Sequence, residues 1–295
     1  MFHKILVCSD GSEGALAAAR MSAQIAQRFD SAVLLIHPFA GRDWEFAVSR
    51  EGLDAYAAEA RRELEEHTGR IFREAGVKYE ALLEYGHPAE AITRVAQQHQ
   101  TDLIVIGGPT DMPSFLMDSV SEQVLHQAHC PVLIVRADQE PQKAREWQRL
   151  LLASDGSEGS CQATVTAVRI AQHFAAVLCV LNVLDASAFS FSLAPCLNAN
   201  SENPYSRAEK ILAAENLLAK ITRDVSTAAV EAGVSCSFHQ ETGYAAETIT
   251  GFADRDDTDL IVIGCRGQGT FTSLLPGIVS DRVAHLSRHS VLVTR

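Results

Sequence analysis

KILVCSDGSEG, residues 4–14, joins a short apolar run to an acidic turn that contains glycine. An apolar run of about five residues that stops at Asp-Gly is typical of a buried β-strand leading into a turn. The next residues, 13–29, are rich in alanine, and Ala19, Ala23 and Ala26 share one face if this segment is helical. The stretch therefore predicts a buried strand, a turn and a helix in succession.

The hexapeptide SDGSEG of this stretch, residues 9–14, returns 145 positions later as residues 154–159. The two halves of the chain share further segments: IAQRF (25–29) and IAQHF (170–174), EAGV (74–77 and 231–234), TDLIVIG (101–107 and 258–264), and HCPVLIVR (129–136) and RHSVLVTR (288–295). A duplication with so long a period predicts two related domains, because solenoid repeats recur every ~20–50 residues. We expect a first domain over residues 1–137, a linker over 138–148 and a second domain over 149–295.

An insertion distinguishes the second copy from the first. The spacing between matched segments grows from 145 to 157 residues after the second predicted strand, so the second copy carries 12 extra residues within 185–206. Its apolar side chains would form a lid or an interface at the mouth of a pocket: Phe189, Phe191, Leu193 and Pro195. A tolerated surface insertion is the alternative. Trp44 and Phe46 occupy the corresponding region of the first copy.

Apolar runs and helical patterns alternate within each copy. In the first copy the predicted strands are 4–8, 32–39, 77–86, 101–107 and 131–136, and the predicted helices are 13–29, 53–76, 87–100 and 119–129. Continuous apolar strands that alternate with helices predict a parallel sheet covered on both faces. The expected fold class is therefore α/β, with two tandem doubly wound domains that each contain a five-stranded parallel sheet. Such sheets bind ligands beyond the carboxyl ends of their strands, where the strand order reverses.

The 295-residue chain is acidic, with a formal net charge of −12 and no basic cluster. Because this charge repels nucleic-acid phosphates and anionic lipids, we expect neither nucleic acid nor membrane as a partner. No apolar run approaches the ~18 residues that span a bilayer, and the first residues do not read as a signal peptide, so we expect a cytoplasmic protein. The seven cysteines are scattered and form no C-x-x-C pair, which favours buried, reduced thiols.

The stretch LIVIGCRGQGTFTSLLPGIVSDRV, residues 260–283, is rich in glycine where a predicted strand ends and a helix follows. Glycines such as Gly264, Gly267 and Gly277 let the backbone approach a ligand closely. A helix that begins near Ile278 would direct free N–H groups and its positive dipole end toward an anion. On spacing alone, phosphate binding and a plain loop that leads into a helix both fit this stretch.

Four segments make the chain similar to the universal stress protein family in a tandem form: ILVCSDGSEGA, GHPAEAI, DLIVIG and SVSEQVLHQAHCPVLIVR, each mirrored in the second half. The resemblance implies a Rossmann-like fold of the type that binds adenine nucleotides, and a role in the stress response or signalling without catalysis. Family members that bind ATP carry Gly-x-x-Gly-x9-Gly followed by Ser or Thr. Gly264, Gly267 and Gly277 match this pattern, whereas Ile278 stands at the hydroxyl position.

The resemblance also implies contacts for ATP, or a similar nucleotide with its Mg²⁺, in the second half. Ala153 and Ser154 would lie near the base, Asp155 beside the ribose, and Val183, at the end of its strand, would offer backbone groups to adenine. The phosphates would lie against Gly264, Arg266, Gly267, Gly277, Ile278 and Ser280. Ile278 keeps its N–H but lacks a hydroxyl bond of ~1.5–3 kcal/mol, for which Ser280 in the first helical turn would partly substitute.

The first half departs further from the nucleotide-binding pattern. Its loop is two residues shorter, and Thr110 and Asp118 replace the second and third glycines, although Ser119 keeps the hydroxyl. A carboxylate where phosphates would lie adds repulsion, and Pro109 and Pro113 remove N–H donors. We therefore expect the second half to bind the nucleotide and the aspartate of the first SDGSEG to be a structural remnant.

Three other patterns have simpler interpretations. HQAHC, residues 126–130, spaces two histidines and a cysteine like metal ligands but lacks a fourth, and we expect no metal site. The acidic run DRDDTD, residues 254–259, lacks the closing Glu of a calcium loop and is predicted to be a solvated loop. Ser12 and Ser157 have no histidine at a recognisable partner position and are predicted to be helix N-caps.

These observations favour a non-catalytic module that senses or carries an adenine nucleotide in its second half. Hydrolysis would be slow at most, because no residue is recognisable as a base for the attacking water. The alternative is a structural or partner-binding protein in which both pockets are degenerate, as Ile278 and Asp118 suggest. An adenylate-forming ligase is disfavoured by the acidic SDGSEG turn. We expect the two copies to pack through PVLIVR and SVLVTR, which leaves the chain self-sufficient or able to form a homodimer.

Overall fold

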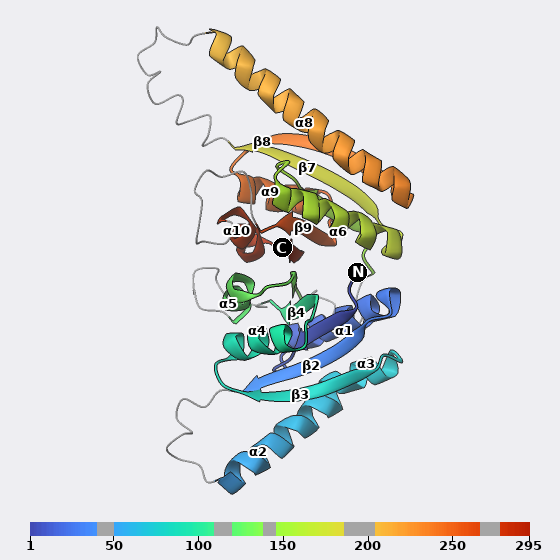
Figure 1. The fold of residues 1–295 in the computed structure, drawn as a ribbon, viewed down its shortest axis with the longest axis vertical. Helices are drawn as coiled ribbons and strands as arrows, with labels where there is room; N and C mark the ends of the chain where they lie inside the picture. Colours follow the sequence, from blue (N-terminus) through green and yellow to red (C-terminus); the bar gives the residue numbers. More distant parts are fainter. Residues whose placement is uncertain (40–49, 109–119, 138–145, 186–203, 266–277) are drawn as a thin grey trace, which may run out of the picture. The chain divides into compact units, whose positions relative to one another are not determined.

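The computed structural model describes residues 1–39, 50–108, 120–137, 146–185, 204–265 and 278–295 (Figure 1). The chain divides into two compact units, Met1–Glu146 and Trp147–Arg295. In each unit, helices cover both faces of a parallel β-sheet, which confirms the expected α/β class and the tandem pair of doubly wound domains (Figure 1).

The first unit begins with a strand and alternates strands with helices. In chain order its elements are β1 (Lys4–Cys8), α1 (Glu13–Phe29), β2 (Ala32–Phe39), α2 (Arg50–Glu63), η1 (Leu64–Gly69), α3 (Arg70–Glu74), β3 (Tyr79–Tyr85), α4 (Pro88–Gln98), β4 (Leu103–Gly107), α5 (Val120–Gln127) and β5 (Val132–Val135). The strand order is β3-β2-β1-β4-β5, and all neighbours are parallel. The order therefore reverses between β1 and β4.

The second unit repeats this plan. Its elements are β6 (Arg149–Ala153), α6 (Glu158–Phe174), β7 (Val177–Asp185), α8 (Pro204–Ala232), β8 (Cys236–Gly243), α9 (Ala245–Arg255), β9 (Leu260–Gly264), α10 (Ile278–Leu286) and β10 (Ser290–Thr294). The order β10-β9-β6-β7-β8 is again parallel throughout, with its reversal between β6 and β9.

Helices α1 and α6 begin where serine hydroxyls accept otherwise unpaired N–H groups. Ser12 Oγ accepts the N–H of Ala15 at 3.3 Å, and Ser157 Oγ accepts the N–H of Ser160 at 3.2 Å. Both serines have extended backbone angles, as N-cap residues do. These contacts confirm the interpretation of the two serines as helix caps.

The helix predicted over 53–76 is not a single regular α-helix. It consists of α2, the π-helical segment η1 and α3. In a π-helix each turn holds more residues than in an α-helix, so the side chains beyond it rotate to new directions. Thr68, within η1, is completely buried, and its hydroxyl faces that of Ser9 just after β1. The predicted long helix that Gly76 closes is confirmed, but the amphipathic pattern gave no sign of the π-helical segment within it.

A buried tryptophan marks the start of the second unit. Trp147, which the sequence places in the linker, is only 2% exposed, and its ring lies 4.9 Å from that of Phe174 at the end of α6. Aromatic pairs at this separation add to the energy of burial. Trp147 therefore belongs to the core of the second unit.

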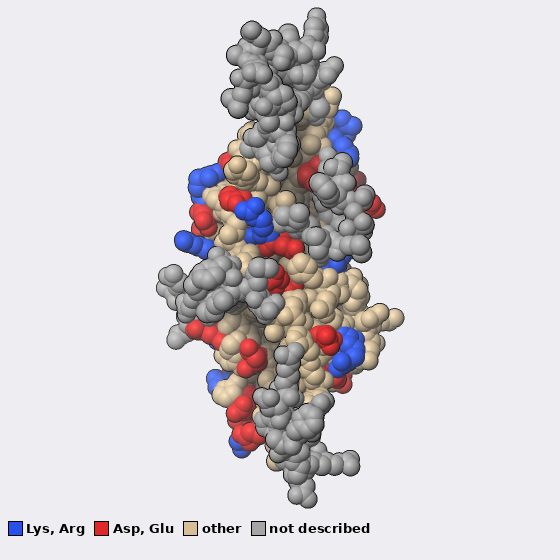
Figure 2. Space-filling view, turned by 90° about the vertical axis from the view of Figure 1, so that its left-hand side faces the viewer, with Lys and Arg blue, Asp and Glu red and all other residues tan. Residues whose placement is uncertain are grey.

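Charged side chains of both signs are interspersed over the visible face in Figure 2. Two exposed ion pairs occupy related places in the two units: Arg94 with Glu84 at 2.9 Å, and Arg255 with Glu241 at 2.6 Å. Pairs this exposed contribute at most about 1 kcal/mol each. Within the described parts of the chain, no helix has both the length and the apolar character required to cross a membrane.

Candidate functional site

The candidate site lies at the carboxyl ends of β6 and β9, two adjacent strands between which the strand order reverses. From β6 the chain continues into α6, and it leaves β9 at Gly264. A Cβ atom on Gly264 would lie 2.6 Å from the carbonyl carbon and oxygen of Gly159, so only glycine fits. The end of β9 therefore packs directly on the first turn of α6, at the place where doubly wound sheets bind ligands.

A tight turn carries Asp155 at this edge of the sheet. Ser154 is buried and donates its N–H to the carbonyl of Leu181 at 3.0 Å, which keeps it in line with β7. Asp155 Oδ1 accepts the N–H of Ser157 at 3.0 Å, and Gly156 has a φ of +71°, which favours glycine. The turn thus fixes the direction of the aspartate before α6 begins.

Side chains from two other elements hold the carbonyl groups of this turn. Asn182 of β7 donates its amide to the carbonyl of Ser154 at 2.8 Å, and Gln240 of β8 donates to Asn182 Oδ1 at 3.0 Å. Lys220 of α8 donates to the carbonyl of Gly156 at 3.1 Å. None of these three residues was predicted from the sequence. A single asparagine within the apolar run VLCVLNVLD was the signal that would have pointed to one of them.

The first unit builds the same turn with different partners. Asp10 Oδ1 accepts the N–H of Ser12 at 2.9 Å, and a ring nitrogen of His37 lies 2.8 Å from the carbonyl of Ser9. The hydroxyls of Ser9 and Thr68 are 2.8 Å apart, whereas Ser154 in the second unit donates its hydroxyl to Ser160 at 3.2 Å. The two turns share a backbone path but differ in what supports them.

The position expected to face the base also differs between the units. β7 continues to Asp185, so Val183 does not end its strand as expected, although it lies near the carboxyl edge and is half-buried. The matching residue of the first unit is Pro38. Pro38 pairs with Glu84 of β3, and Val183 pairs in the same register with Glu241 of β8. Proline has no N–H, so the first unit lacks one backbone donor at this position.

The family model for "Universal stress protein family" matches residues 1–136 and 146–295. The chain belongs to this family. The two matches also confirm the tandem form. A universal stress protein of Methanocaldococcus jannaschii is 35% identical over 143 residues, covering 46% of this chain and 83% of the relative. One of Thermus aquaticus is 36% identical over 143 residues, covering 46% of this chain and 100% of the relative.

Solved structures agree on the fold. The crystal structure of a universal stress protein from Archaeoglobus fulgidus aligns with a TM-score of 0.70 at 20% identity, covering 100% of this chain and 97% of that one. A putative universal stress protein from Pseudomonas aeruginosa aligns with a TM-score of 0.63 at 20% identity, covering 99% of this chain and 93% of that one. At this level of identity the likeness supports the fold alone.

Much of the loop expected to hold phosphates lies outside the described residues. The phosphate-loop residues outside the described ranges are Arg266, Gly267 and Gly277 in the second unit and Pro109, Thr110, Pro113, Asp118 and Ser119 in the first. The apolar residues expected near the pocket mouths also lie outside them: Trp44, Phe46, Phe189, Phe191, Leu193 and Pro195. α10 begins at Ile278, where a helix was expected, and Ser280 is buried in its first turn. The phosphate contacts of this universal stress protein thus stay predictions.

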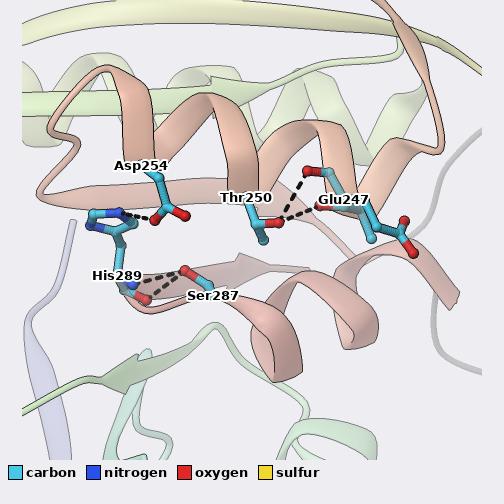
Figure 3. A network of polar contacts seen from close by, with 6 residues as sticks. Glu247, Thr250, Asp254, Ser287 and His289 are labelled. Atoms are coloured by element: carbon cyan, nitrogen blue, oxygen red, sulfur yellow. Dashed lines mark hydrogen bonds and ion pairs between the residues drawn. The ribbon is translucent and has the colours of Figure 1, made fainter.

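The acidic run at 254–259 is a solvated loop only in part, because Asp254 and Arg255 belong to the end of α9 and Thr258 is buried in the turn that leads into β9. Asp259 accepts the N–H groups of Gln148 and Arg149 at 2.7 and 2.8 Å, where β6 begins. Asp254 lies 2.9 Å from the ring of His289, across the gap between α9 and the start of β10 (Figure 3). In the first unit, Asp102 accepts the backbone N–H groups of residues 3 and 4 in the same way. The aspartate of both TDLIVIG segments therefore holds the beginning of the first strand of its unit.

The metal-like spacing in HQAHC is not realised on a helix. α5 ends at Gln127, so His129 and Cys130 lie beyond it. Over the ranges that the structure describes, no three His, Cys, Asp or Glu residues gather closely enough to hold a metal ion.

The described cysteines are free thiols in different environments. Cys8 is buried, and burial, followed by the charges of Asp10 and Cys130, raises the pKa of its thiol. Burial also raises the pKa of Cys179 and of Cys236. Cys161 is exposed on α6, contrary to the expectation that the cysteines are buried, and Cys196 lies outside the described residues.

Proposed function

We propose that the second unit binds an adenine nucleotide, ATP or a close analogue, and that this stress-response protein acts by binding rather than by catalysis. One observation carries the proposal. The Asp155 turn and Gly264 stand side by side at the reversal of strand order, where a doubly wound sheet receives its ligand. The aspartate would meet the ribose hydroxyls, and the N-terminus of α10 would face the phosphates.

The second unit is preferred over the first for two reasons. Val183 retains the backbone N–H that Pro38 lacks at the matching position. The sequence also keeps all three glycines of the phosphate loop in the second half, while the first half carries Asp118 where the third belongs. The proposal therefore predicts one nucleotide for each chain.

Titration calorimetry of the full chain with ATP and Mg²⁺ tests the proposal. Asp155→Ala should weaken binding about ten- to a hundredfold, because a hydrogen bond to a charged group contributes about 1.5–3 kcal/mol. Asp10→Ala is a matched control, since Asp10 makes the same turn bond, 2.9 Å against 3.0 Å for Asp155. It should leave ATP binding unchanged.

Two results would contradict the proposal in different ways. Absence of binding at millimolar ATP would favour a partner-binding protein with two degenerate pockets. Loss of binding in Asp10→Ala, with Asp155→Ala unaffected, would assign the nucleotide to the first unit instead. Mass spectrometry of small molecules released from the purified protein would identify a nucleotide retained during purification.

A further inference from the structure

Asn182 is a buried polar side chain that connects the turn of the candidate site to the edge strand β8. It is 1% exposed, and its neighbours on both sides in β7 are apolar. A buried amide without partners would be costly, so its contacts matter for stability. Its nitrogen donates to the carbonyl of Ser154, the residue directly before Asp155, and its oxygen accepts from Gln240.

The backbone carbonyl of Ser154 determines the orientation of both amides. A carbonyl can only accept, so Asn182 must turn its NH₂ toward Ser154 and its oxygen toward β8. Gln240 stands directly opposite Asn182 in the parallel register and must therefore present its own NH₂. Gln240 and Asn182 thus form a chain of two hydrogen bonds, here called the relay, that runs from the edge strand β8 to the carbonyl of Ser154.

The relay lies on the same face of the sheet as α8. His239, the neighbour of Gln240 in β8, places its ring 5.1 Å from that of Phe252 in α9. Since side chains alternate along a strand, Gln240 lies on the opposite face. From that side Lys220 of α8 also reaches the turn, at the carbonyl of Gly156. The carbonyls on both sides of Asp155 are therefore held by side chains.

The first unit has only part of this arrangement. His37 keeps the contact to the carbonyl of Ser9, but Leu83 stands opposite it in β3, where the second unit has Gln240. An aliphatic side chain cannot donate a hydrogen bond, so the relay does not extend to the edge strand of the first unit. The two units thus differ at the residues that would hold the aspartate turn most firmly.

We propose that Asn182 and Gln240 are positioning residues for Asp155, and that they set how strongly the second unit prefers a nucleotide with ribose hydroxyls. This inference rests on the proposed nucleotide binding and deepens it. The relay holds the carbonyl of Ser154, which fixes the path of the next residue and so directs the carboxylate of Asp155 toward the hydroxyls. Without the relay the turn still forms, but its carboxylate is less firmly placed.

The test compares ATP with 2′,3′-dideoxy-ATP, which lacks both ribose hydroxyls. In the wild-type chain ATP should bind more tightly than the dideoxy nucleotide. Gln240→Leu introduces the residue of the first unit at an exposed position, and should weaken ATP binding about three- to tenfold, the range for one hydrogen bond. It should leave affinity for the dideoxy nucleotide unchanged. Asn182→His, which again copies the first unit, should lower the ATP preference in the same direction.

Leu83→Gln is the matched control, because it makes the reverse exchange in the first unit and should not alter either affinity. Equal weakening of both nucleotides by Gln240→Leu, or no change in either, would overturn the positioning role while leaving nucleotide binding intact. If the wild-type chain binds neither nucleotide, the proposed function fails, and the positioning role fails with it.

Discussion

Gly264→Ala tests the close packing that forms the candidate site. The added Cβ would lie 2.6 Å from the carbonyl carbon and oxygen of Gly159 and 3.0 Å from the nitrogen of Ser160. These are backbone atoms at the start of α6, so they cannot move aside as a flexible side chain can. Overpacking of this kind costs about 1–3 kcal/mol, which lowers the melting temperature by roughly 2–4 °C for each kcal/mol in a domain of this size.

Urea unfolding followed by tryptophan fluorescence measures this cost, because Trp147 is buried in the second unit against Phe174. Gly251→Ala is the control. A Cβ on Gly251, inside α9, meets only the guanidinium of Arg255 at 3.7 Å, so alanine should stabilise the helix by up to about 1 kcal/mol. If Gly264→Ala proved as stable as the wild type, the argument that β9 and α6 require glycine at their contact would be refuted.

Three further predictions concern the described contacts. Ser157→Ala removes the N-cap of α6 and should cost about 1 kcal/mol in urea unfolding, most of which Ser157→Asp should restore. Asp259→Ala removes the acceptor for two backbone N–H groups at the start of β6 and should cost about 1.5–3 kcal/mol; a cost below about 0.5 kcal/mol would contradict the role given to it. Because the pKa of the Cys8 thiol is raised in the folded state, unfolded chains lose this proton first, from about pH 8.5. The contribution of the Cys8 proton to the free energy of unfolding is therefore complete below that pH. As the pH rises toward the folded pKa, this contribution falls by up to about 1.4 kcal/mol for each pH unit. Unfolding free energies measured between pH 7 and 10 should therefore fall more steeply for the wild type than for Cys8→Ala, and parallel curves would contradict the assignment.

Local signals were strong enough to predict most of the fold. The helix expected over 13–29 and the strand expected over 32–39 have those bounds in the structure, because a capping serine and an abrupt change in hydropathy mark their ends. The location of the Asp155 turn and of Gly264 followed from the rule that loops at strand carboxyl ends carry function. These features depend on residues close together in the chain.

Several features that were not predicted depend on contacts between distant segments. The π-helical turn exists where Thr68 reaches Ser9, 59 residues away, and no local pattern announces it. Asp259 resembles any acidic loop residue until the start of β6 is placed beside it. The same holds for Asn182, whose polarity was visible in the sequence but whose partner Gln240 lies 58 residues further along the chain.

The different partners of the SDGSEG serine have a consequence for how the two halves can evolve. Ser154 relies on the hydroxyl of Ser160, whereas the first half has Ala15 at that place and supplies Thr68 from another helix. A hybrid in which α1 and α6 were exchanged would leave Ser154 beside an alanine and deprive its hydroxyl of that acceptor. The effect of substituting either SDGSEG serine on stability therefore depends on its partner in the same half, Ser160 or Thr68. The two identical hexapeptides therefore lie in structural surroundings that cannot be exchanged without loss of a hydrogen bond.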